Sequence, residues 1–255
     1  MRAMAVRAIA GNVIREAIRQ KIIYVTVLFA FALFAIAPML PSFNVGVRIQ
    51  LFEDIALGVA YLAIAVIAVA LSVNQVPGEV EKRTIYNVLS KPVRRSSFLI
   101  GKYLGVLAVL IACSFLMGTA IFAFAFGYFG VLSYGLFQGI LTATLEASVI
   151  SAFAILISTF ASPTVNVFAC LLFYFVGHVK NDALKIALGM SEAPQGPLLA
   201  LRYLLPSLEN FNVNEMVARG VILRPSFVVE LILYAAAFSI AFLALASFAM
   251  ARKEL

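Results

Sequence analysis

The stretch of sequence that decides the fold is YLGVLAVLIACSFLMGTAIFAFAF, residues Tyr103–Phe126. It contains no charged side chain, and it is longer than the roughly 20 apolar residues that a helix needs to cross a bilayer core. Five further predominantly apolar stretches accompany it, of which Val165–Val179 is short for a full crossing: Ile22–Leu40, Ile55–Gln75, Phe137–Phe160, Val165–Val179 and Phe227–Met250. The sequence therefore predicts an all-α, polytopic membrane protein with six transmembrane helices.

The composition of the whole chain supports this prediction. Of the 255 residues, 64% are hydrophobic and 12% are charged, whereas soluble domains average about 45–50% and about 25%. Too few charged side chains are present to cover the surface of a soluble globule. A transmembrane β-barrel would show alternating segments of about 10 residues, and the sequence has none. We therefore expect one helical membrane domain over residues 1–255.

The positions of the basic residues predict how the helices are oriented. Lys and Arg concentrate in the short loops on the cytoplasmic side of a membrane. The segments before the first span, between spans two and three, and after the last span hold 13 of the 19 basic residues: Arg2, Arg7, Arg15, Arg19, Lys21, Lys82, Arg83, Lys91, Arg94, Arg95, Lys102, Arg252 and Lys253. The loops expected on the opposite side of the membrane, residues 41–54 and 127–136, contain a single basic residue, Arg48. We expect both termini in the cytoplasm.

Residues 1–20 have the pattern of an amphipathic helix. One face is apolar, with Val6, Ile9, Val13 and Ala17, and the opposite face carries Asn12, Arg15, Glu16 and Arg19. A helix with a basic polar face tends to lie in the plane of the membrane surface, so we expect an interfacial elbow helix that leads into the first span. That span is longer than the 7–15 apolar residues of a signal peptide, and we expect no cleavage there.

A charged segment, residues 77–92, connects spans two and three and reads PGEVEKRTIYNVLSKP. Pro77-Gly78 end the second span, and Pro92 ends whatever follows. About three helical turns fit between them, with Glu79 and Arg83 in the i,i+4 relation that allows an ion pair. A short charged helix fixed at both ends to the membrane can be held by a soluble partner. A solvated basic loop is the alternative interpretation.

The residue pattern of this segment favours the first interpretation. It runs Glu79, Glu81, Arg83-Thr84, Leu89-Ser-Lys-Pro92, Phe98 and Gly101-Lys102. This pattern resembles the signature of ABC transporter permeases of the type-two export family. Within that family it is most similar to permeases of the NosY kind, which are grouped with multicopper-enzyme maturation systems. The opening segment Asn12–Arg19 is also similar to the family.

The resemblance implies a function and a set of partners. Such permeases dimerise, with an identical copy or a close homologue, and bind two copies of a separate P-loop ATPase subunit that holds ATP and Mg. The segment 77–92 would be the coupling helix, with Glu79, Glu81, Arg83 and Thr84 as its ATPase-coupling residues. The expected protein is the permease subunit of an ATP-driven exporter in a bacterial or archaeal cytoplasmic membrane. It would work by alternating access, with a link to metalloenzyme maturation.

The chain itself has no sign of catalytic or cofactor chemistry. Gly101-Lys102 lacks the upstream glycine and the following Ser or Thr of a P-loop, so ATP and Mg are expected in the partner subunit. One histidine, His178, is too few for a multi-histidine metal site in one chain. Cys113 and Cys170 lie in separate apolar runs. We expect no enzyme activity, no cofactor and no metal here, and basic residues that meet lipids rather than nucleic acid.

One ionisable residue, Glu146, lies inside the fourth predicted span. An ionisable group at this depth costs roughly 2.5–3.5 kcal/mol on insertion scales and normally faces the bundle interior or a water-filled cavity. Hydroxyl side chains flank it in the sequence: Thr142, Thr144, Ser148 and Ser151. Two interpretations stay open. Glu146 lies on the substrate pathway, or it is a protonated or hydrogen-bonded glutamate that holds helices together.

Residues 180–226 form the long extracytoplasmic loop of the predicted topology. Leu198–Leu205 and Val213–Leu223 have the pattern of short amphipathic helices. In the resembled family, short helices at this position dip into the outer leaflet and cap the exit path. The alternatives are a packing lid without substrate contact and a docking surface for a periplasmic protein.

Two functions of other classes compete with the exporter hypothesis. One is an ATPase-coupled membrane scaffold that moves a periplasmic partner and transports nothing. The other is an ATP-independent secondary transporter with Glu146 as its proton site. That second alternative predicts internal repeats and discontinuous helices, and the two halves of the sequence show no convincing repeat.

Overall fold

The computed structural model describes residues 2–20, 24, 26–29, 31, 45–78, 95–130, 133–188 and 205–252. Its regular elements are α1 (Arg2–Arg19), α3 (Val45–Val73), α6 (Arg95–Phe124), the π-helix η2 (Ala125–Phe129), α7 (Tyr134–Ser158), α8 (Pro163–Leu188), the 3-10 helix η3 (Leu208–Phe211), α10 (Asn214–Ala218) and α11 (Pro225–Arg252). These ranges contain no strand, which confirms the all-α prediction for the part of the chain that is described.

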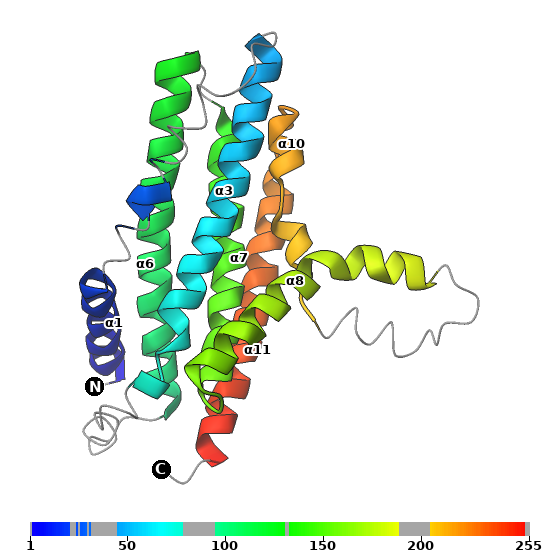
Figure 1. The fold of residues 1–255 in the computed structure, drawn as a ribbon. Coiled ribbons are helices and arrows are strands. Elements are labelled where there is room, and N and C mark those ends of the chain that lie inside the picture. The colour runs from blue at the N-terminus through cyan, green and yellow to red at the C-terminus, as the bar shows by residue number, and fades with distance from the viewer. Residues whose placement is uncertain are drawn as a thin grey trace.

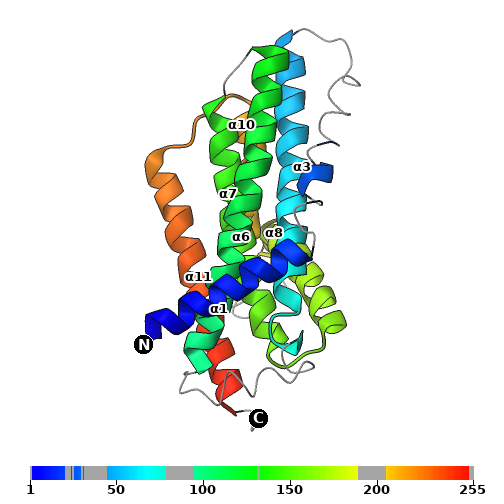
Figure 2. The same cartoon turned by 90° about the vertical axis from the view of Figure 1, so that its left-hand side faces the viewer.

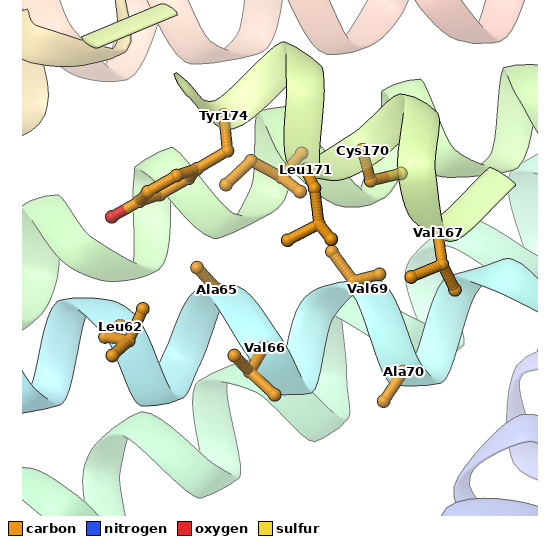
Figure 3. A pocket seen from close by; sticks show the side chains of 10 residues that line it. Leu62, Ala65, Val66, Val69, Ala70, Val167, Cys170, Leu171 and Tyr174 are labelled. Carbon is orange, nitrogen blue, oxygen red and sulfur yellow. The ribbon is translucent and has the colours of Figure 1, made fainter.

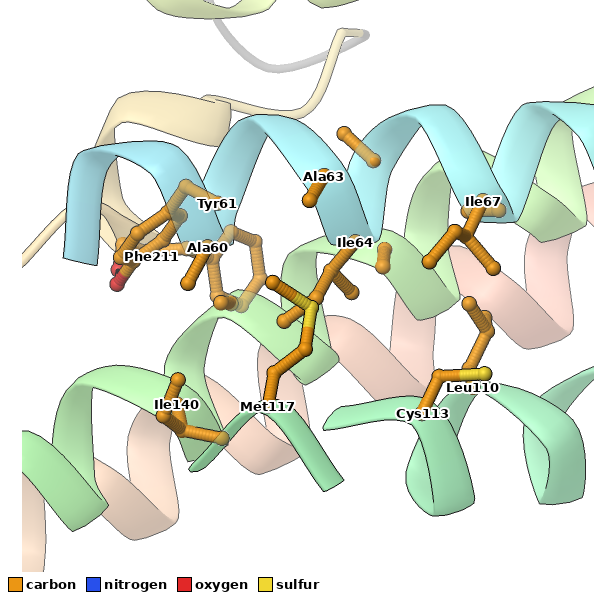
Figure 4. Packing of buried hydrophobic residues seen from close by; sticks show 14 of the residues in the cluster. Ala60, Tyr61, Ala63, Ile64, Ile67, Leu110, Cys113, Met117, Ile140 and Phe211 are labelled. Carbon is orange, nitrogen blue, oxygen red and sulfur yellow. Dashed lines mark hydrogen bonds between the residues drawn. The ribbon is translucent and has the colours of Figure 1, made fainter. Parts of the chain in front are cut away.

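Helix α7 lies at the centre of the bundle and packs against α3, α6, α8 and α11. Figure 1 shows α3, α6, α7 and α11 side by side along one direction. We call the end where α3 begins the upper end, and the end where α11 finishes the lower end. Buried side chains of α3, α6 and α7 form the core between these helices, among them Ile64, Leu110, Met117 and Ile140 (Figure 4).

Five helical segments are long and apolar enough to cross a membrane: Gly46–Val73, Ser96–Phe129, Tyr134–Ser158, Pro163–Asn181 and Pro225–Arg252. They correspond to the second to sixth predicted spans. Of the first predicted span, Ile22–Leu40, the structure describes only residues 24, 26–29 and 31, which are helical. The predicted coupling segment after Gly78 lies outside the described residues, and both stay predictions.

The second helix starts earlier than the predicted Ile55. Helix α3 already begins at Val45, so it includes three charged residues, Arg48, Glu53 and Asp54, that the hydropathy pattern placed in the preceding loop. Glu53 is buried and forms a hydrogen bond with Ser133. The Arg48 guanidinium donates a hydrogen bond to the hydroxyl of Tyr128 over 2.8 Å. Polar groups with such partners do not interrupt a helix, and apolar length alone could not predict its end.

The loop predicted from residue 180 onward also begins too early. Helix α8 continues to Leu188, beyond the predicted end at Val179. Lys180 donates a hydrogen bond to the carbonyl oxygen of Leu205, and the Asn181 side chain bonds to Ser207 over 3.1 Å. These partners allow two polar residues within the helix.

The predicted helices of the long loop need a second correction. Of Val213–Leu223, only Asn214–Ala218 is helical. Gly220 follows with a φ of 74°, a left-handed conformation that ends a helix. Leu198–Leu205 lies outside the described residues except for its last residue.

Helix α1 crosses α6 at a steep angle near the lower end, as Figure 2 shows. Two glycines of α6 form the contact. A Cβ on Gly105 would lie 2.7 Å from Cβ of Val13 and 2.9 Å from the carbonyl oxygen of Ala10. A Cβ on Gly101 would lie 3.0 Å from Cβ of Ile9. Small residues four positions apart allow two helix backbones to approach closely, so this spacing fixes where α1 packs.

Candidate functional site

Glu146 lies near the middle of α7 and is 2% exposed. It faces α8, where Nε2 of His178 is 3.5 Å from Oε1 of the carboxylate. Within the described residues, neither carboxylate oxygen has a hydrogen-bond partner. Because a buried ionised carboxylate without donors is strongly disfavoured, this position requires either a proton on the carboxyl group or a cation beside it.

His178 presents its two ring nitrogens to different neighbours. Nδ1 lies 3.0 Å from the carbonyl oxygen of Tyr174. Because a carbonyl oxygen only accepts hydrogen bonds, we assign the proton of the neutral ring to Nδ1. Nε2 then carries a lone pair toward Glu146. The ring also packs on that of Tyr174, with centroids 4.4 Å apart, and the His178 side chain stays 22% exposed.

A second polar group lies one helical turn above Glu146. The Tyr61 hydroxyl, from α3, is 2.6 Å from Oγ1 of Thr142 and 2.6 Å from the carbonyl oxygen of Phe211. All three groups are buried, so this set joins α3, α7 and the segment after residue 205. The other hydroxyls near Glu146 in the sequence bond to carbonyl oxygens of their own helix, namely those of Thr144, Ser148 and Ser151.

An apolar groove of about 270 Å³ lies between α3 and α8, below the Glu146 pair. Figure 3 shows the side chains that line it, which are Leu62, Ala65, Val66, Val69, Ala70, Ile150, Val167, Cys170, Leu171 and Tyr174. Leu62 and Leu171 at its rim are more than half exposed. The groove therefore opens sideways, out of the helix bundle.

Tyr174 connects the groove with the Glu146 pair. Its ring lines the groove and also packs on His178. Ile150 lines the groove as well and lies one turn below Glu146 on the same face of α7. A molecule in the groove would therefore lie within about a helical turn of the unpaired carboxylate.

Polar side chains bind the segment 205–224 to the upper end of the bundle. Gln138 of α7 donates to the carbonyl oxygen of Leu223 over 3.0 Å and accepts from its N–H over 2.9 Å. The Asn214 side chain donates to the carbonyl oxygen of Asp54 in α3 over 2.9 Å. The Tyr234 hydroxyl of α11 accepts from the N–H of Ser207 over 2.8 Å. These bonds hold the segment on the bundle, and its role as a packing lid, an exit cap or a docking surface stays a prediction.

The family of the chain follows from its sequence as a whole. A family model described as ABC-2 family transporter protein matches residues 7–245, nearly the full length. The chain belongs to the ABC-2 transporter family. No curated protein matches it significantly. Members of the ABC-2 family are membrane permeases of ABC transporters and associate with an ATP-binding subunit, so this chain is a multi-pass membrane component of such a transporter.

The ATPase-coupling residues predicted for this ABC-2 permease, Glu79, Glu81, Arg83 and Thr84, lie outside the described residues. The helix ends that flank them meet at the lower end of the bundle, in an apolar cluster with the ends of α7 and α11. We call it the lower cluster; it consists of Val76, Phe98, Leu99, Ile155, Ala246 and Met250. The residues on either side of the segment 79–94 therefore belong to one packed cluster.

The structure also gives a physical reason for residues that carry the family resemblance. Gly101 makes room for Ile9 of α1. Lys102 is 3% exposed, with Nζ 5.6 Å from the ring centroid of Phe98, a distance at which a cation is attracted to an aromatic face. These three residues of α6 thus position α1 and the lower cluster directly after the coupling segment.

The sequence pattern predicted Glu146 but not its surroundings, which include His178, Tyr61 and Tyr174. Polar groups inside apolar runs were the available signal for these residues and for Gln138, because a buried hydroxyl or amide needs a partner. The same holds for Asn166 of α8, which joins two helices. It donates to the carbonyl oxygen of Ala154 over 2.9 Å.

Proposed function

We propose that this ABC-2 chain is the permease subunit of an ATP-driven exporter in a bacterial or archaeal cytoplasmic membrane. It would work as a homodimer, or beside a close homologue, with two copies of a separate P-loop ATPase that bind ATP and Mg. The observation that carries the proposal is the family match over residues 7–245, together with the charged segment between two membrane helices. The lower end would face the cytoplasm.

The packing at the lower end supports a mechanical role for residues 79–94. The segment joins α3 to α6, and both helix ends contribute to the lower cluster. Helix α1 contacts α6 through Gly101 and Gly105, only a few residues further along. A movement imposed by the ATPase would therefore reach α1, α3 and α6 together. Ion pairs at such a solvent-exposed interface determine how the two subunits align and which partner binds, more than they determine the binding affinity.

The translocation pathway would include the groove between α3 and α8. Its rim is exposed in the single chain, so a second permease copy or lipid would complete it. ATP binding would change the side of the membrane to which this pathway opens. The two conformations must bind the ATPase with different affinities, because otherwise hydrolysis cannot bias them.

The NosY resemblance adds a link to metalloenzyme maturation. This link would run through a partner protein outside the membrane, with the exposed side of the segment 205–224 as its docking surface.

The coupling role is tested by charge reversal in the full transporter. The variant Glu79→Lys/Glu81→Lys should lose at least 80% of the transport-linked ATPase activity or release the ATPase during purification. The matched control is Glu215→Lys, because Glu215 lies on α10 at the upper end with its side chain 79% exposed. The control should behave like the wild type. Full ATPase binding and activity in the double variant would contradict the coupling role.

A further inference from the structure

The groove between α3 and α8 suits an apolar molecule. Among its lining residues, only Tyr174 and Cys170 carry a polar atom on the side chain. Its volume of about 270 Å³ is just below the range of roughly 300–1,000 Å³ typical of small-molecule sites. The body of a ligand held here would be hydrocarbon, entering from the side.

The Glu146 pair beside the groove has the opposite character. Glu146 and His178 do not line the groove but adjoin its Ile150 and Tyr174, and hydrogen-bond acceptors lie together there. Glu146 offers two carboxylate oxygens, both without a hydrogen-bond partner among the described residues. In the neutral His178 ring with its proton on Nδ1, as assigned from the Tyr174 carbonyl oxygen, Nε2 directs a lone pair toward the same carboxylate 3.5 Å away. Acceptors that face each other in this way require a shared proton or a cation that donates to both.

From this juxtaposition we propose that Glu146 and His178 bind the amino head group of a cationic amphiphile whose tail lies in the groove between α3 and α8. A primary ammonium has three N–H donors, enough for both carboxylate oxygens and Nε2. The inference rests on the proposed transport function, and it names the class of substrate. Hydrogen bonds to charged groups are roughly twice as strong as neutral ones, so the head group would dominate selectivity.

In the empty site a proton takes the place of the cation. Binding of the protonated amine then releases the proton of the Glu146 carboxyl, and the charge inside the membrane does not change. The titratable groups that face Glu146 are Tyr61 from α3 and Tyr174 and His178 from α8. The exchange avoids an uncompensated charge in the bundle, which would be costly.

The test compares three probes that differ only in the head group: octylamine, octanol and octanoate. Each is titrated against the purified permease–ATPase complex in detergent, and binding is followed by the shift in melting temperature and by equilibrium dialysis of labelled probe. The wild type should bind octylamine at least tenfold more tightly than octanol or octanoate, the ratio expected for a hydrogen bond to a charged group.

Glu146→Gln keeps the shape of the side chain and should reduce the preference for octylamine at least tenfold. The matched control is Glu53→Gln, because Glu53 is also a buried glutamate, on α3. It should keep the wild-type preference. Ala65→Leu, which narrows the groove, should weaken all three probes alike.

Two outcomes would overturn the inference. One is equal binding of the three probes by the wild type, and the other is an octylamine preference that survives in Glu146→Gln. Should Glu146→Gln fail to fold, Glu146→Asp provides the second measurement, since it keeps the charge and must keep the preference. Co-purification of the ATPase is measured separately and tests the permease assignment. The binding of the three probes tests only the proposed substrate class.

Discussion

The two ends of the bundle are held together by different forces. At the upper end, polar side chains bond to backbone groups of distant segments: Gln138 to Leu223, Asn214 to Asp54, and Tyr61 to Phe211. At the lower end, the described contacts between helices are mainly apolar, although the Asn166 side chain of α8 also donates to the carbonyl oxygen of Ala154 in α7. They include the lower cluster and the glycine contact between α1 and α6.

This difference has a mechanical consequence. Hydrogen bonds to backbone groups have fixed directions and specify one arrangement, whereas apolar surfaces in contact can slide over each other by small amounts. Under the proposed function, the lower end follows an ATPase and benefits from the second kind of contact, whereas the upper end caps a pathway and benefits from the first. We therefore expect a more fixed upper end and a more adaptable lower end.

The largest effect is expected from filling the glycine contact at the lower end. In Gly105→Ala the new Cβ would lie 2.7 Å from Cβ of Val13 and 2.9 Å from backbone of Ala10. Because backbone cannot move aside easily, we expect a loss of about 2–3 kcal/mol in the free energy of unfolding, measured by SDS titration.

Gly11→Ala is the matched control for this change. Gly11 lies on α1, and a Cβ there meets nothing within 4 Å. Removing a glycine from a helix should stabilise it by roughly 0.5–1 kcal/mol. Equal effects of the two substitutions would show that α1 does not pack on α6 as described.

A smaller effect is expected from removing the amide at the upper end. Gln138→Leu keeps most of the volume but leaves both the N–H and the C=O of Leu223 without their partner. Inside membranes such bonds contribute about 0.6 kcal/mol on average and up to about 1.7, so two should contribute about 1–2 kcal/mol. Hydrogen exchange near Leu223 should increase as well. Unchanged exchange would argue against the fixed upper end.

An effect of similar size is expected from Tyr61→Phe. The ring stays in place, and only the hydroxyl is lost, which leaves the carbonyl oxygen of Phe211 and the N–H of Val213 without this partner. By the same reasoning we expect a loss of about 1–2 kcal/mol in the free energy of unfolding. The control is Tyr24→Phe, since Tyr24 is 70% exposed and should show no change. A loss larger than that of Gly105→Ala would contradict the expected order of these effects.

The apolar runs predicted the five described spans, because a hydrocarbon layer demands a continuous apolar stretch. Helix ends were predicted less well. Lys180 and Asn181 belong to α8 because their partners, Leu205 and Ser207, lie on a segment that returns to the bundle. No local pattern contains that information.

The residues of the candidate site were likewise predicted only in part. The cost of an ionisable group in a membrane helix pointed to Glu146 as a buried residue, and Glu146 is buried. Its neighbour His178 is 32 positions later, and Tyr61 meets the carbonyl of Phe211 across 150 positions. Such pairs follow from how α3, α7 and α8 pack, which a single sequence does not display. The coupling residues remain a prediction from the family resemblance.

The most direct test of the central claim is affinity purification of the tagged chain from its native membrane in mild detergent, with quantitative mass spectrometry and an ATPase assay on the product. If the chain is the permease of an ABC transporter, a P-loop subunit should co-purify in a 1:1 ratio to it, and the product should hydrolyse ATP in a reaction that vanadate inhibits. A lone chain without ATPase activity, under conditions that preserve a known ABC transporter in the same membranes, would contradict the claim.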